Sequence, residues 1–248
     1  MRFSLVLILL ACGLLFGTAN ASVTLLGSRI IYPAQAASVD LQFKNNDDIP
    51  YVIQTWFDDG DVNSQPGQPS QAPFIVTPPV FRIQPKAGQI ARVLFTPRQP
   101  LPQDRESLFW FNMLQIPPVT SAPGARQNSM TVMLRNRLKL FYRPAAIGKP
   151  VHPLRGIRVR YLFDAQKGGG LLIDNPQPWH LSLTALSLDI AGKTFHSGAE
   201  TIPPFTEKTF WLRGARQRLQ DAGTATVEAI NDQGAIIRER YAVPAQQR

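Results

Sequence analysis

The chain has 248 residues and carries 26 Lys and Arg against 17 Asp and Glu, a formal net charge of +9 at pH 7. Apart from one segment described below, these cations are scattered and are not interleaved with aromatic residues as in a nucleic-acid groove. They therefore indicate a solvated basic surface and no nucleic-acid partner. With a single cysteine, the composition also excludes a disulfide-stabilised scaffold.

The first residues, "MRFSLVLILLACGLLFGTANA", have the three parts of a signal peptide. A cationic start precedes an apolar run that is too short to span a bilayer, and the small residues Ala19 and Ala21 mark a cleavage site. We expect residues 1–21 to be removed after Ala21 during export. The mature chain is expected to contain no membrane span.

Cys12 lies within this apolar run, so the stretch from Leu9 to Cys12 is also weighed as a lipid-attachment site. The apolar run continues past the cysteine through Phe16, which favours an ordinary cleaved signal peptide. Lipidation at Cys12 stays open as the alternative. Without Cys12 the mature chain has no cysteine, and an exported protein of this size that needs no disulfide fits a bacterial periplasm.

The first half of the mature chain consists of short segments in which apolar and polar residues alternate. A period of two is typical of β-strands, and Pro, Asn, Asp or Gly bounds each segment. The expected strands include residues 38–45, 50–57, 92–97 and 107–118. Long irregular loops are expected at 63–73 and 117–127, and the pattern as a whole predicts a β-sandwich.

Residues 129–144, "SMTVMLRNRLKLFYRP", alternate over about 14 residues, more than twice the usual strand length. Pro144 has to end this strand or leave the sheet. One face is apolar and is interrupted by Asn136, whereas the opposite face is cationic. The apolar row is Met130, Val132, Leu134, Leu138 and Leu140, and the cationic row is Arg135, Arg137, Lys139 and Arg143.

A second series of expected strands follows a junction at 144–153 that is rich in Pro and contains Gly. Such a junction is typical of a linker between domains. We therefore predict an all-β protein with two β-sandwich domains, 22–146 and 147–248. The second series is 157–164, 169–175, 180–190, 208–212, 224–231 and 236–244.

The sequence offers little for catalysis or for a metal site. The three histidines, His152, His180 and His196, have no partner at the spacing of metal ligands and are expected on the surface or in turns. No Gly-x-Ser-x-Gly motif supports a nucleophile, and "GKT" at 192–194 lacks the upstream glycine of a phosphate loop. We predict a binding protein without enzymatic activity, cofactor or metal.

Residues 101–118, "LPQDRESLFWFNMLQIPP", resemble the signature of the periplasmic chaperones of the chaperone-usher pathway, which escort pilus and fimbrial subunits. The resemblance is supported by residues 73–85 and 137–147 and by segments of the second half. It implies two immunoglobulin-like sandwiches set at an angle with a cleft between them. It also implies a chaperone that binds, folds and caps pilus subunits in the periplasm and delivers them to an outer-membrane usher.

The resemblance further implies how a subunit is bound. A pilus subunit is an immunoglobulin-like sandwich that lacks its last strand, and the chaperone lends it the strand at 129–143 by donor-strand complementation. The donated side chains at the matching positions are Asn128, Met130, Val132 and Leu134. Arg29 and Lys139 match the two residues that anchor the subunit's C-terminal carboxylate.

Three further positions match an ionic link between the two domains of these chaperones: Glu106, Arg143 and Asp232. The family divides by the loop before the donor strand. About 11 residues lie between Pro118 and Met130, which is typical of the short-looped members that serve rod-like pili. The alternative from a different class is an exported carbohydrate-binding or adhesive β-sandwich, in which 129–144 is an ordinary core strand.

Overall fold

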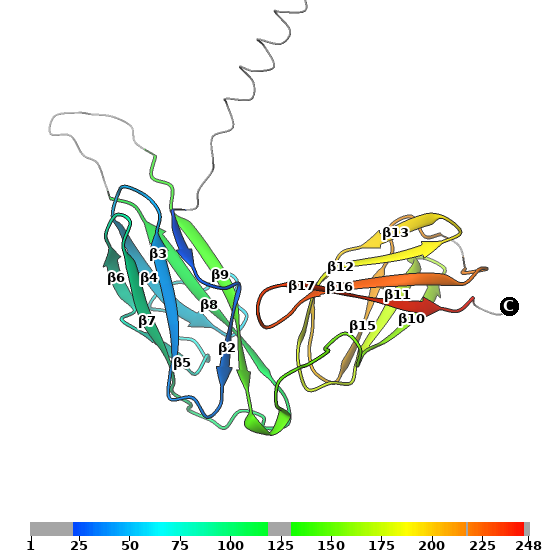
Figure 1. Cartoon of the computed structure of the whole chain (residues 1–248), viewed down its shortest axis with the longest axis horizontal. Helices are drawn as coiled ribbons and strands as arrows, with labels where there is room; N and C mark the ends of the chain where they lie inside the picture. Colours follow the sequence, from blue (N-terminus) through cyan, green and yellow to red (C-terminus); the bar gives the residue numbers. More distant parts are fainter. Residues whose placement is uncertain (1–21, 119–129, 217, 246–248) are drawn as a thin grey trace, which may run out of the picture.

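The computed structural model describes residues 22–118, 130–216 and 218–245. They form two β-sandwich domains that meet at an angle (Figure 1), which confirms the predicted fold class. The strands of the N-terminal domain are β1 (Val23–Leu25), β2 (Arg29–Pro33), β3 (Val39–Asn45), β4 (Tyr51–Asp58), β5 (Phe74–Thr77), β6 (Val80–Ile83), β7 (Gly88–Phe95), β8 (Ser107–Ile116) and β9 (Leu134–Arg143).

Two sheets face each other in the N-terminal domain. One has the strand order β1-β3-β7-β5, and the other has the order β2-β9-β8-β4-β6. All pairings are antiparallel except that of β2 with β9, which is parallel. The β2–β9 pair lies on the side of the domain that faces the C-terminal domain (Figure 1), so side chains on the outer face of these strands reach toward the second domain.

Alternation places the aromatic core between the two sheets. On β8, Phe109, Phe111 and Met113 are buried in the core, and Trp110 and Asn112 project from the opposite, outer face of the sheet. Successive side chains of a strand point to opposite faces, so the outer face of β8 lies beside the cationic face of β9. Because core and outer-face side chains alternate along β8, the packing of its apolar side chains in the core also fixes the position of the side chains on its outer face.

The C-terminal domain pairs a three-stranded sheet, β10-β11-β15, with a sheet in the order β13-β12-β16-β17, in which β14 also pairs with β12. Its core is mostly aliphatic and is separate from the aromatic core of the first domain. Its strands are β10 (Arg158–Asp164), β11 (Gly168–Asn175), β12 (Leu181–Ile190), β13 (Lys193–Ser197), β14 (Thr201–Ile202), β15 (Thr206–Trp211), β16 (Gly223–Ile230) and β17 (Ile236–Val243).

The chain passes between the domains through a short 3-10 helix, η1 (Ala145–Ile147). Pro144 has no backbone donor and ends β9, and Gly148 adopts a positive φ of 62° that redirects the chain after η1. Trp179 of the C-terminal domain donates its Nε1–H to the Gly148 carbonyl oxygen at 3.2 Å. The connection is therefore held against the second domain.

The prediction of one strand over 129–144 is wrong at its first part. β9 begins at Leu134, and Met130 to Met133 lie outside any strand in the described chain. The reason is the lack of a neighbour: β8 ends at Ile116, and its last pair with β9 joins Gln115 to Leu134. Alternation is present before Leu134, but no backbone partner is available there to form a ladder.

Candidate functional site

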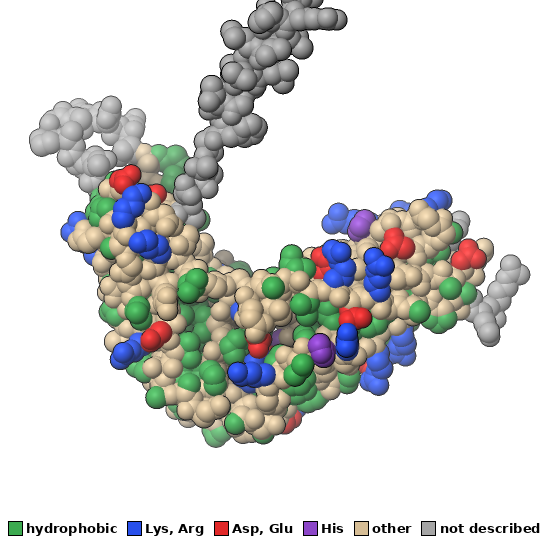
Figure 2. Space-filling model, viewed as in Figure 1, with side chains coloured by type: hydrophobic (Ala, Val, Ile, Leu, Met, Phe, Trp, Pro, Cys, Tyr) green, Lys and Arg blue, Asp and Glu red, His purple; other side chains and the backbone are tan. Residues whose placement is uncertain are grey.

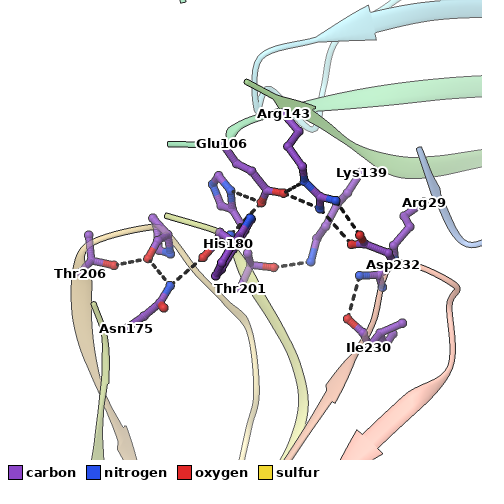
Figure 3. Close-up of polar contacts among 12 residues, drawn as sticks. Arg29, Glu106, Lys139, Arg143, Asn175, His180, Thr201, Thr206, Ile230 and Asp232 are labelled. Carbon is purple, nitrogen blue, oxygen red and sulfur yellow. Dashed lines mark hydrogen bonds and ion pairs between the residues drawn. The ribbon is translucent and has the colours of Figure 1, made fainter. Parts of the chain in front are cut away.

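Arg29 and Lys139 lie directly opposite each other in the parallel pair of β2 and β9. Their side chains share the outer face and reach the C-terminal domain (Figure 3). Arg29 donates an Nη1–H to the Ile230 carbonyl oxygen at 3.0 Å, and the Lys139 ammonium donates to Thr201 Oγ1. The fold thus brings two predicted site residues, 110 positions apart in sequence, to one place between the domains.

The electrostatic setting of these two cations is unfavourable for positive charge. Burial lowers the pKa of Arg29, although Asp232 and Glu106 oppose this shift. Burial also lowers the pKa of Lys139, and the charge of Arg29 lowers it further. Neither cation forms an ion pair with a carboxylate in the described part of the chain, and the buried Nε of Arg29 has no hydrogen-bond acceptor there. Two adjacent, partly desolvated cations of this kind favour an anionic ligand.

Arg143, at the end of β9, joins the two domains by ion pairs. Its Nη2 lies 2.6 Å from Glu106 Oε1 of its own domain, and its Nη1 lies 2.6 Å from Asp232 Oδ2 of the second domain. A second bond from Nη2 to Asp232 Oδ1 at 3.0 Å makes that contact bidentate. The three residues predicted as an ionic link therefore lie together, as Figure 3 shows.

His180 belongs to the same group, although its sequence context did not indicate this. Its backbone N–H donates to Glu106 Oε2 at 2.8 Å, and its ring Nδ1 lies 3.3 Å from the same oxygen. The side chain is 7% exposed, and its ring packs at 5.5 Å from that of Phe141. His180 lies in the loop between β11 and β12, as expected of a surface or turn histidine, but its ring is not on the surface because the N-terminal domain covers it. His152 and His196 are exposed.

A cavity of about 300 Å³ lies beside these residues at the domain junction. Its walls include Arg29, Phe141 and Arg143 of the first domain and His180 and Asp232 of the second. Lys139 does not line it, so the cavity and the Arg29–Lys139 pair share only one cation. In the view of Figure 2, charged and histidine side chains gather where the two domains meet.

The apolar row predicted to be donated is exposed at the far end of β9. Met130 is 90% exposed, Val132 is 70% exposed and Leu134 is 49% exposed. Asn128, the fourth predicted member, lies outside the described residues. Large apolar side chains in an exposed row are unusual on a protein surface and indicate an interaction site.

On one side, the edge of β9 next to this row has no neighbouring strand in the part of the chain that the structure describes. β8 pairs with β9 from Leu134 onward, whereas β2 pairs with β9 only from Lys139. Between Leu134 and Leu138, the edge on the β2 side therefore carries backbone groups without a ladder partner among the described strands. Such an edge is a template for a strand from another chain.

Within the described ranges, no three His, Cys, Asp or Glu side chains group as a metal site, and no helix there is long and apolar enough to cross a bilayer.

The fold and the site together define a two-domain binding protein with an open strand edge that ends at a cationic pair. The chain belongs to the pili assembly chaperones. Residues 22–148 match the family described as pili and flagellar-assembly chaperone, PapD N-terminal domain. Residues 159–241 match the pili assembly chaperone PapD, C-terminal domain.

Relatives support this assignment over nearly the whole chain, which confirms the resemblance drawn from residues 101–118. The chain is 35% identical to the probable fimbrial chaperone YadV of Escherichia coli over 222 residues, 88% of each protein. It is 37% identical to the chaperone protein HifB of Haemophilus influenzae over 201 residues, 80% of each. The crystal structure of the YadV chaperone has a TM-score of 0.74 at 29% identity, covering 90% of this chain and all of the other.

Proposed function

We propose that this chaperone binds a pilus or fimbrial subunit along the open edge of β9, caps it in the bacterial periplasm and delivers it to an outer-membrane usher. In this proposal the protein acts by binding and has no catalytic step. The family membership supports the general role. A structure of the Salmonella enterica SafA pilin with the SafB chaperone, 28% identical with a TM-score of 0.70 and covering 91% of this chain and 98% of the other, supports the kind of partner.

One observation carries the proposal: the open edge of β9 leads directly to the two cations. β2 runs parallel to β9 and begins at Arg29, opposite Lys139. A subunit strand in line with β2, lying along Leu134 to Leu138, would therefore end at Arg29 and Lys139. Its terminal carboxylate would accept charge-assisted hydrogen bonds from the guanidinium and the ammonium. Among the described residues no carboxylate pairs with Arg29 or Lys139, and the carboxylate of the subunit would supply that partner.

The exposed row explains what the subunit gains. Strand addition satisfies the backbone groups of an incomplete sheet, and alternate side chains fill its apolar groove, as is known for chaperones and pilins. Met130, Val132 and Leu134 are exposed in the free protein and are available for that groove. We propose that Met130 to Met133 become strand when the subunit supplies the missing backbone partner.

The cellular setting follows from the leader sequence. Residues 1–21 lie outside the described part of the chain, and we propose that they are a signal peptide that is removed after Ala21. The two family matches support domains with the proposed bounds 22–146 and 147–248. The Arg143 link to Glu106 and Asp232 is proposed to hold the angle between these domains.

Isolation of the tagged protein from periplasmic extract of its own host, followed by mass spectrometry, tests the proposal. We expect a pilus or fimbrial subunit to co-purify in a stoichiometric complex with the unaltered protein and to be lost with Lys139→Ala. N-terminal sequencing of the same sample should begin at Ser22. Recovery of the protein with a glycan and no subunit would favour the carbohydrate-binding alternative and overturn the proposal.

A further inference from the structure

A buried carboxylate that the proposed binding site does not use lies behind the open half of β9. Asp58 is the last residue of β4, and it is 1% exposed on the outer face of the five-stranded sheet. Burying an ionised carboxylate is costly unless it is paired and hydrogen-bonded. The groups that pair with Asp58 therefore indicate the role of its buried charge.

Among the described residues, the partners of Asp58 lie on the outer face or in the loop after β4. Arg137 of β9 donates from Nη2 to Oδ1 at 2.5 Å and from Nε to Oδ2 at 3.2 Å. Asn112 of β8 donates to Oδ2 at 2.7 Å, Ser64 Oγ donates to it at 3.1 Å, and the Gly60 N–H donates to Oδ1 at 2.8 Å. Burial alone raises the pKa of Asp58, but the hydrogen bonds from Arg137 and Asn112 lower it below the ordinary value.

Arg135, two residues earlier on β9, is tied into the same network. Its Nη2 donates to Asn112 Oδ1 at 2.7 Å and to Ser64 Oγ at 3.2 Å, and its Nη1 donates to the Val62 carbonyl oxygen at 3.0 Å. Its guanidinium also lies over the Trp56 ring at 5.0 Å. Asn112 thus accepts from one arginine of β9 and donates to the carboxylate that binds the other.

Arg137 itself is held between Asp58 and the face of Trp110, with its Cζ 4.1 Å from the ring centroid. A guanidinium over an aromatic ring is attracted by the ring's negative face, and its planar fork fits a carboxylate in a fixed orientation. The two arginines therefore have defined positions on the outer face. Both lie within Leu134 to Leu138, the half of β9 for which β8 is the only neighbour among the described strands.

We propose that Asp58 is a positioning residue that presets this half of β9 in the free chaperone. The ion pair with Arg137 and the bonds through Asn112 to Arg135 replace the stabilisation that a second neighbouring strand gives to residues 139–143. The strand is then ordered before a subunit arrives, so less conformational entropy is lost on binding. The benefit to subunit capture rests on the proposed function, whereas the preset strand is a property of the free protein.

Hydrogen exchange of the full-length free protein tests this without any subunit. In Asp58→Asn, which keeps the side-chain shape and removes the charge, we expect those amides of 134–138 that bond to β8 to exchange about tenfold faster, while the amides of 139–143 stay unchanged. Arg137→Lys keeps the positive charge but loses the fork, and an intermediate acceleration confined to the same segment is expected. Val93→Ala, a core truncation on β7 in the opposite sheet, is the control for general loss of stability.

The comparison of the two halves of β9 decides the outcome. If Asp58→Asn and Arg137→Lys accelerate exchange equally in both halves, as Val93→Ala is expected to do, the network only stabilises the domain and the proposal is overturned. Unchanged exchange at 134–138 in Arg137→Lys overturns it as well, even if Asp58→Asn does not fold. A chaperone that shows the localised effect but binds no pilus subunit would contradict the proposed function and leave the positioning role intact.

Discussion

The two halves of β9 have one sequence pattern and two different environments. From Lys139 to Tyr142 the strand has β2 on one side and β8 on the other, and Leu140 is fully buried in the core. From Leu134 to Leu138 it has β8 alone among the described strands, and the apolar residues from Leu134 back to Met130 are exposed. A period of two therefore predicts a strand and a buried face, but it does not say whether the covering groups belong to the same chain.

The largest effect is expected from placing a charge in the exposed half. Val132→Asp should reduce subunit binding by more than about 100-fold, because the carboxylate would enter an apolar groove without a partner. Thr131→Asp, on the other face of the extended segment, is the matched control and should be much milder. The measurement is subunit recovery with each purified variant, and equal loss in both would contradict the assignment of the two faces.

Truncating one leucine in each half separates folding from binding. Leu140→Ala should lower the free energy of unfolding by about 2 to 5 kcal/mol, because it leaves a cavity in a closed core. Leu134→Ala should lower it by less than about 1 kcal/mol, because that side chain is 49% exposed. Denaturant unfolding gives both values. Leu134→Ala should instead weaken subunit binding, and a large stability loss there would mean that the row is already buried in the free protein.

Removing a cation at the border between the halves should affect the ligand and not the fold. Lys139→Ala and Arg29→Ala are each expected to weaken subunit binding by on the order of 2 to 5 kcal/mol, because a bound carboxylate keeps only one of its two partners. The melting temperature of the free chaperone should fall little, since neither cation has an ion pair to lose among the described residues. Normal subunit accumulation beside either variant would contradict the anchor.

The smallest effect is a pH dependence at Lys139. Burial and the charge of Arg29 lower the pKa of this ammonium in the free chaperone, whereas a bound carboxylate would raise it again. Subunit affinity should therefore be constant below the lowered pKa and fall by up to about tenfold per pH unit as the pH rises through it. Calorimetry between pH 7 and 10 measures this decline, which Lys139→Arg should remove. The same decline in Lys139→Arg would assign the titration to another group.

Most of the fold was predictable because it depends on local alternation. The strands around Val39, Trp56 and Trp110 follow from period two and from the turn residues that bound them. The start of β9 was not predictable, since it is set by where its neighbour β8 ends at Ile116. Strand length in a sheet is a property of pairs, and a single sequence does not state the pairs.

The site also contains residues that the sequence indicated and residues that it did not. The resemblance to the chaperone family indicated Arg29 and Lys139, but composition and spacing alone did not, because their proximity comes from a parallel register between distant strands. The burial of His180 and the network of Asp58 depend on contacts across domains and across strands, and nothing in their local sequence distinguishes them from surface residues. Asp58 had no motif at all to mark it.

Lys139 has a fixed position on β9, so the position of every other residue of the strand can be given as a distance from it. Once extended, the nine residue steps from Lys139 back to Met130 span about 30 Å at 3.3 Å per residue. If the carboxylate of a partner is held at Lys139, the pocket of its groove that accepts Met130 has to lie at this same distance from the carboxylate. The chaperone therefore sets that distance. Extra residues after the partner's natural terminus would shift every pocket along the row, and the protein would thereby select partners by where their chain ends.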